Sequence, residues 1–140
     1  MLSTLRKDER GFTLTELLVV ILILSILAAL GIAMLVSQRS KAQDAEAKRA
    51  ASTVARALEV YHQERDTYVG ADRATLARYE PTIVNVRGLQ IDPLEDRYEL
   101  SVDSEAEAGG GPFRIEREDG DSDRICAVPG QGGCPESGLW

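Results

Sequence analysis

The chain has 140 residues, a formal net charge of −7, two cysteines and one histidine. This length suggests a single domain, since about 100–200 residues per domain is usual. The negative charge disfavours direct nucleic-acid binding, because contacts with phosphates supply most non-specific affinity. One His and two Cys are too few for an ordinary four-ligand zinc site without carboxylates. The sequence shows no arrangement of residues typical of an active site, so neither catalysis nor a cofactor is expected.

The chain begins with a short polar segment, MLSTLRKDER, which contains five charged residues and no core-forming pattern. Segments of this kind are often removed during maturation, so residues 1–11 are interpreted as a leader peptide and not as part of the fold.

A membrane-length apolar run follows the leader. From Leu17 to Val36 there is neither a charged residue nor a proline, and only Ser25 and Gly31 interrupt the large apolar side chains. About 20 such residues are needed to cross a bilayer as a helix. The positive residues before the run favour a cytoplasmic N-terminus. Two other interpretations of the apolar run remain open. It could be a secretory signal peptide that is cut near Ala28 or Ala33, or a plain single-pass membrane anchor without assembly.

The helix is expected to continue beyond the membrane. Residues 37–65 contain no Pro or Gly and are rich in alanine, the best helix former. Apolar residues recur at spacings of three or four and predict one buried stripe, Ala47, Ala50, Val54, Leu58 and Tyr61. Asp44 and Lys48 are spaced as an i, i+4 pair and are placed on the exposed side. The outer half of the helix therefore needs a surface to cover its stripe.

Shorter elements are predicted after the helix. Gly70 is the first strong stop, and Asp72 is placed as the cap of a short helix over 73–79 that Pro81 ends. A loop over 66–82 then gives way to alternating patterns over 83–86, 98–102, 113–115 and 125–128, separated by turn-rich linkers. These segments predict a small antiparallel sheet over 83–140 that covers the helical stripe, an α+β arrangement.

The C-terminal region holds the two cysteines and an acidic loop. Cys126 and Cys134 can form one disulfide if they lie on the far side of a membrane, and free thiols are the alternative. Asp119, Asp121 and Asp123 alternate and offer oxygens of the kind that calcium binds. They do not match the EF-hand pattern, so a solvated acidic turn is favoured over a metal site.

One carboxylate, that of Glu16, stands at the mouth of the apolar run. A charge at the edge of a membrane span is costly and calls for a partner. Cleavage after Gly11 would give Phe12 a new α-amino cation about one helical turn from Glu16. In a helical array, the amine of one subunit could pair with the carboxylate of its neighbour and so compensate both charges.

Residues 11–18, GFTLTELL, resemble the class III signal of type IV prepilins and type II secretion pseudopilins. The resemblance implies cleavage between Gly11 and Phe12 by a prepilin peptidase, N-methylation of Phe12, and polymerisation by a platform protein and an ATPase. It implies a pilin fold: a long N-terminal helix, membrane-embedded over 12–36, packed on a small antiparallel sheet within the ectodomain 37–140. The pair Cys126 and Cys134 resembles the disulfide-bounded C-terminal loop of many type IV pilins.

The resemblance predicts a structural subunit of a type IV pilus-like filament, which is anchored in the cell membrane before assembly and lies outside it afterwards. A pseudopilin of a type II secretion or DNA-uptake system is the alternative, and a monomeric membrane-anchored binding module is a third hypothesis. Many pilins carry a proline in the span, but this chain has none from Phe12 to Glu80. Local loss of helix on assembly is therefore a hypothesis for Gly31 alone.

Overall fold

The computed structural model describes residues 12–140 of the chain. The chain divides into an N-terminal unit that ends at Leu35 and a C-terminal unit, Val36–Trp140. The predicted leader, residues 1–11, lies outside the described residues. The predicted division of the mature chain after residue 36 stays a prediction.

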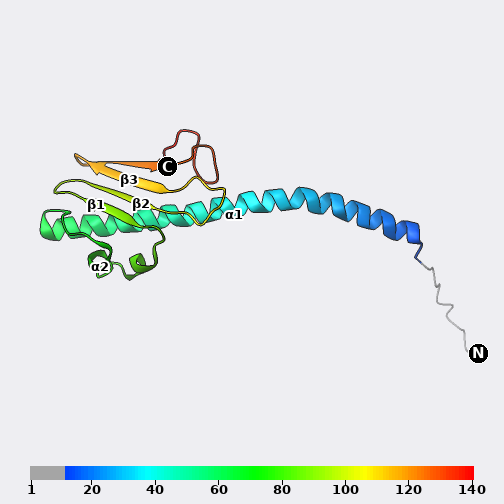
Figure 1. Ribbon diagram of the computed structural model, residues 1–140, viewed down its shortest axis with the longest axis horizontal. Coiled ribbons are helices and arrows are strands. Elements are labelled where there is room, and N and C mark those ends of the chain that lie inside the picture. The colour runs from blue at the N-terminus through cyan, green and yellow to red at the C-terminus, as the bar shows by residue number, and fades with distance from the viewer. Residues whose placement is uncertain (1–11) are drawn as a thin grey trace, which may run out of the picture. The chain divides into compact units, whose positions relative to one another are not determined.

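One helix, α1, runs from Leu14 to Arg65 (Figure 1). It ends where the sequence predicted, because Asp66 adopts a positive φ of 57° and its backbone N–H bonds to the carbonyl oxygen of His62 at 2.7 Å. A residue in the left-handed region after the last turn is a common way for a helix to end.

Two short helices follow α1. Helix α2 covers Arg73–Leu76, and Asp72 caps it by accepting a hydrogen bond from the backbone N–H of Thr75 at 2.7 Å. The predicted cap is confirmed, although the predicted helix extended to residue 79. The 3₁₀ helix η1 covers Pro81–Asn85, so the strand predicted over 83–86 is wrong. Pro81 fixes the first helical φ, and the Glu80 side chain accepts a hydrogen bond from the Thr82 backbone N–H, so both residues favour a helical turn.

Four strands form an antiparallel sheet in the order β1-β2-β3-β4. Their bounds are Gln90–Pro93 for β1, Tyr98–Val102 for β2, Phe113–Glu118 for β3 and Asp121–Cys126 for β4. The sequence analysis missed β1, an edge strand of only four residues that ends in a proline, as edge strands allow. It also placed β4 too late, because the predicted acidic linker is mostly strand and only Asp119 and Gly120 form the turn.

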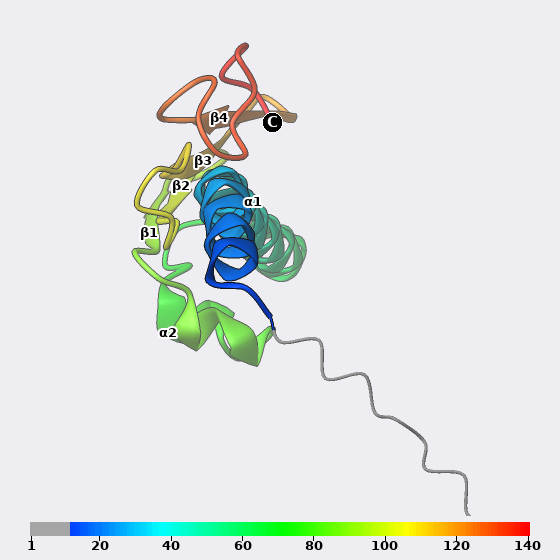
Figure 2. The same cartoon turned by 90° about the vertical axis from the view of Figure 1, so that its right-hand side faces the viewer.

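The sheet lies along one side of the outer half of α1 (Figures 1 and 2). Within the C-terminal unit, the helical stripe and the inner face of the sheet share one hydrophobic core, as predicted. The fully buried members include Ala51, Val54, Leu58, Leu76, Ile83, Leu100 and Phe113. The burial of Ile83 shows that the apolar position was identified correctly even though its secondary structure was not. The predicted α+β fold is confirmed.

Candidate functional site

The N-terminal end of α1 carries the residues predicted to direct assembly. Phe12 precedes the helix and is 74% exposed. Gly11, on the other side of the predicted cleavage point, lies outside the described residues. Cleavage and methylation at this junction stay predictions.

Glu16 is held by a capping box that the sequence analysis missed. Thr13 is the residue before the helix, and its hydroxyl accepts a hydrogen bond from the backbone N–H of Glu16 at 3.2 Å. In return, the Glu16 carboxylate accepts from the backbone N–H of Thr13 at 2.9 Å and from its hydroxyl at 2.7 Å. This reciprocal pair is the S/T-x-x-E capping box, whose signal was readable as Thr13-Leu14-Thr15-Glu16.

The capping box fixes the direction of the Glu16 carboxylate. The side chain turns back toward the start of the helix and lies at the backbone N–H of Thr13. Cleavage after Gly11 would create the new amine one residue before that N–H. The carboxylate has further acceptor sites beyond the two bonds to Thr13, so it can keep the cap and still accept from a cation.

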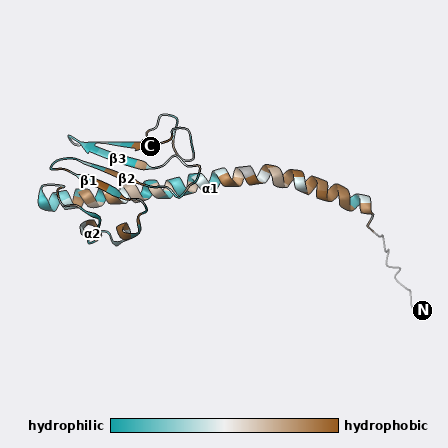
Figure 3. Ribbon diagram, in the orientation of Figure 1, coloured by the Kyte–Doolittle hydropathy of each residue, from teal (hydrophilic) through white to brown (hydrophobic). Residues whose placement is uncertain are grey.

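The apolar half of α1 consists mostly of hydrophobic residues (Figure 3). Every large hydrophobic side chain described from Leu17 to Val36 is at least 43% exposed. The helix is long and apolar enough to cross a membrane. Ser25 bonds internally to the carbonyl oxygen of Leu22 at 2.7 Å, so the polar group in the run is satisfied. Exposed apolar residues of this kind are stable when they contact lipid or other apolar helices and not water.

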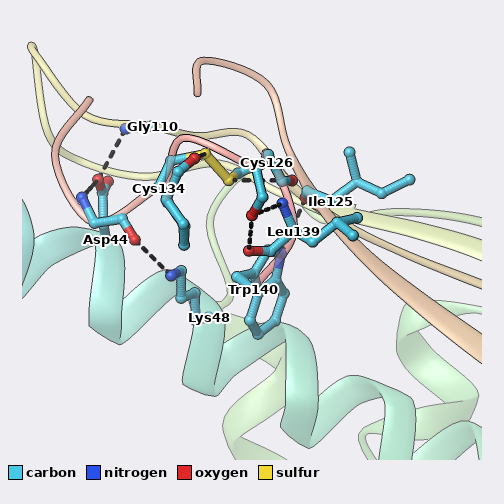
Figure 4. Close-up of a disulfide and its surroundings, with 12 residues drawn as sticks. Asp44, Lys48, Gly110, Ile125, Cys126, Cys134, Leu139 and Trp140 are labelled. Atoms are coloured by element: carbon cyan, nitrogen blue, oxygen red, sulfur yellow. Dashed lines mark hydrogen bonds between the residues drawn. A yellow bond between two sulfur atoms is a disulfide. The ribbon is translucent and has the colours of Figure 1, made fainter. Parts of the chain in front are cut away.

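In the C-terminal unit, Asp44 is fully buried, so its predicted exposed position is wrong. Its carboxylate accepts a hydrogen bond from the Gly110 backbone N–H at 2.8 Å (Figure 4). It also accepts from the Gly133 backbone N–H at 2.7 Å and from the Ser104 hydroxyl at 2.5 Å. A buried carboxylate is retained only where such donors compensate it. No local pattern around Asp44 signals donors that lie 60 to 89 residues away. Asp44 thus attaches two separate loops to α1.

Lys48 strengthens the same junction one helical turn further on. Its ammonium donates to the carbonyl oxygen of Gly133 at 2.6 Å and lies 5.2 Å from the centre of the Phe113 ring and 5.5 Å from that of Trp140. Partial burial lowers the pKa of Lys48, and the negative charge of Asp44 opposes this shift. The pair is an i, i+4 pair, as predicted, but it faces the C-terminal loop and not solvent.

The structure joins Cys126 and Cys134 in a disulfide, whose Cα atoms are 6.0 Å apart. The bridge encloses the loop that Asp44 and Lys48 hold at Gly133 (Figure 4). Trp140 holds the C-terminal end of the chain against β4, because its indole N–H donates to the carbonyl oxygen of Ile125 at 3.0 Å. The glycine-rich tail therefore owes its structure to contacts with the helix and β4, since its own sequence favours no regular element.

A polar cluster lies between α1 and the sheet. The Glu59 carboxylate pairs with Arg117 at 3.1 Å and accepts hydrogen bonds from the hydroxyls of Tyr68 and Tyr98 at 3.2 and 3.3 Å. Burial raises the pKa of Tyr98 well above its usual value, and the charge of Glu59 adds to the shift. The pKa of Tyr68 is raised by the same two causes in the same order. The cluster satisfies its own members and joins helix to sheet.

The three acidic residues considered for calcium do not form a group that could hold a metal ion. Asp119 lies in the β3–β4 turn, and Asp121 and Asp123 lie on β4, all of them exposed. Across residues 12–140, no group of three His, Cys, Asp or Glu side chains is arranged to hold a metal ion.

Comparisons with known proteins identify related sequences. Residues 6–32 match the model of the prokaryotic N-terminal methylation motif. The chain is also 30% identical over 106 residues to the type II secretion system core protein G of Klebsiella michiganensis, an alignment that covers 68% of this chain and 75% of that protein. No solved structure matches significantly. An alignment of this length extends well beyond the motif, so the similarity includes much of the C-terminal unit.

Proposed function

The chain belongs to the type IV pilin and pseudopilin family, and from this premise we propose that it builds a short pseudopilus-type filament of a secretion system. The observation that carries this proposal is the similarity to a type II secretion core protein over three quarters of that protein's length. The absence of a proline from the span supports the same choice. The pseudopilin alternative of the sequence analysis thereby becomes the first candidate.

A longer type IV pilus is the second candidate. The disulfide between Cys126 and Cys134 favours this candidate, because it resembles the disulfide-bounded C-terminal loop of many type IV pilins. Electron microscopy of material sheared from cells separates the two candidates. Long fibres that contain this chain would contradict a filament confined to the cell envelope, and their absence alongside functional secretion would support it.

Processing and anchoring follow the family. The N-terminal helix anchors the chain in the membrane, and the Arg and Lys residues of the leader favour a cytoplasmic N-terminus. A prepilin peptidase would then cut between Gly11 and Phe12 and methylate the Phe12 amine. A platform protein and an ATPase would drive polymerisation of the mature chain. The role is structural, without catalysis by the chain itself.

Register between subunits would come from the Glu16 carboxylate and the Phe12 amine of a neighbour. Two buried opposite charges that meet in the apolar filament core compensate each other, whereas either charge alone is costly there. The capping box supports this role, because it already directs Glu16 toward the start of the helix. The exposed apolar run would serve first as membrane anchor and then as filament core.

Glu16→Gln separates the charge of Glu16 from its part in the helix cap and so tests the electrostatic role. Glutamine also completes a capping box, so the variant keeps the helix start and removes only the charge. We expect normal membrane insertion and an unchanged circular dichroism spectrum, but loss of crosslinkable polymer and of secretion. Thr13→Ala removes the cap hydroxyl but keeps both the Glu16 charge and the backbone N–H at residue 13 that directs the carboxylate, so it is the matched control and should retain polymer. Normal assembly by Glu16→Gln would contradict the electrostatic role.

A further inference from the structure

A groove lies immediately after the apolar run, in the C-terminal unit. It has a volume of about 350 Å³ and is lined by Val36, Arg39, Ser40 and Gln43 of α1 and by Glu105, Glu107 and Ala108 of the β2–β3 loop. The four helical residues have i, i+3, i+4, i+7 spacing and share one helix face. Arg39 is the one cation among the lining residues and lies on the helix side, whereas both glutamates lie on the loop side.

The charged groups of this groove are available to a ligand. Arg39 and Glu107 are exposed and take part in none of the ion pairs found within residues 12–140. Glu105 pairs through one oxygen with Arg87 at 2.7 Å, which leaves its second oxygen as an acceptor. Ser40 adds a hydroxyl from a residue that is only 8% exposed.

The acidic wall is held in place by Asp44. Ser104 and Gly110, at the two ends of the loop that carries Glu105 and Glu107, both donate hydrogen bonds to its carboxylate. The loop is thus fastened to α1 on either side of the groove. The separation of Arg39 from the two glutamates is consequently a property of the fold.

A span that fills the hydrocarbon core with Leu17–Val36 places the groove at headgroup depth. Arg39 follows the last residue of the apolar run by three positions, which is about 4.5 Å of helical rise. The polar layers of a bilayer extend several ångströms beyond a hydrocarbon core of about 30 Å. A residue at this point meets phosphates and the groups attached to them.

We propose that this groove binds the headgroup of phosphatidylethanolamine. Arg39 would bind the phosphate, to which the Ser40 hydroxyl can donate, and Glu107 with Glu105 would accept hydrogen bonds from the primary ammonium. Phosphatidylcholine offers the same phosphate, but its methylated ammonium has no N–H to donate. Binding would set the depth of the subunit in the membrane before assembly, and it does not depend on the kind of filament formed.

The test uses the full chain in a neutral detergent, titrated with phosphatidylethanolamine or phosphatidylcholine of identical acyl chains and followed by native mass spectrometry. We expect phosphatidylethanolamine to bind roughly tenfold more tightly, the contribution of about one charge-assisted hydrogen bond. Arg39→Gln should weaken both lipids alike, because both contain the phosphate. Replacement of both Glu105 and Glu107 by glutamine should weaken phosphatidylethanolamine alone and so remove the preference.

Arg49→Gln, an exposed arginine on the same helix outside the groove, is the matched control and should leave both affinities unchanged. Equal binding of the two lipids by the unmodified chain would overturn the proposal, as would a preference that survives the replacement of both glutamates. Glycerophosphoethanolamine, the soluble headgroup, should bind far more weakly than the lipid. Equal affinity for it would show that the ligand is not a membrane lipid.

Discussion

Replacement of Asp44 by alanine should unfold the junction between α1 and its two loops. The substitution removes the acceptor of three hydrogen bonds and leaves the backbone N–H groups of Gly110 and Gly133 without a partner in a buried site. Each such orphaned donor costs about 1–3 kcal/mol. The better helix propensity of alanine returns only about 0.5 kcal/mol. We therefore expect Asp44→Ala to lower the free energy of unfolding by about 3 kcal/mol.

The assay is thermal unfolding of the full chain in detergent, followed by near-ultraviolet circular dichroism, because Trp140 lies in the affected region. For a unit of the size of Val36–Trp140, each kcal/mol lowers Tm by about 4–8 °C. Asp44→Asn is the informative companion. Its carbonyl oxygen can take the place of the oxygen that accepts from both glycines, while its amide faces the Ser104 hydroxyl. It should cost roughly half as much, and a loss below about 1 kcal/mol in Asp44→Ala would refute the reasoning.

Three further predictions concern the same unit. Replacing Cys126 and Cys134 by serine should destabilise it by about 2.5 kcal/mol, the chain entropy of a bridge that spans a sequence separation of 8, as measured by urea unfolding. Gly132→Ala should be far more destabilising than Gly120→Ala in the same urea assay. Both glycines have positive φ, but of the two only Gly132 is placed so that an added Cβ would overlap the Asp44 carboxylate. Equal losses of unfolding free energy in the two variants would contradict this overlap. Burial raises the pKa of Tyr68 and Tyr98, so the folded chain favours their protonated hydroxyls. Their contribution to the free energy of unfolding is complete below about pH 10, the usual tyrosine pKa, and is lost as pH rises above it. Tyrosinate absorbance should therefore rise together with unfolding, and gradual ionisation of the folded chain would contradict this.

The parts of the fold that the sequence predicted are those governed by local patterns. The helix to Arg65, its apolar stripe, the Asp72 cap and strand β2 all follow from periodicity or from a single side chain near its partner. The 3₁₀ helix at Pro81–Asn85 was misread because a short apolar run fits a strand and a helical turn equally well.

The parts that could not be predicted depend on long-range contacts. Asp44 resembles any polar residue of an exposed helix face until the folded chain brings Ser104, Gly110 and Gly133 to it. Strand β1 is recognisable through its pairing with β2, since four residues that end in a proline are too short a pattern to identify a strand. The capping box differs from both, because its signal was local and was overlooked in favour of the charge on Glu16.

The most direct test of the central claim is the intact mass and N-terminal sequence of the native protein purified from membranes. A processed filament subunit should begin at N-methylated Phe12, without the first eleven residues. A chain that still begins at Met1, or one cut near Ile32 like a secretory protein, would contradict the account.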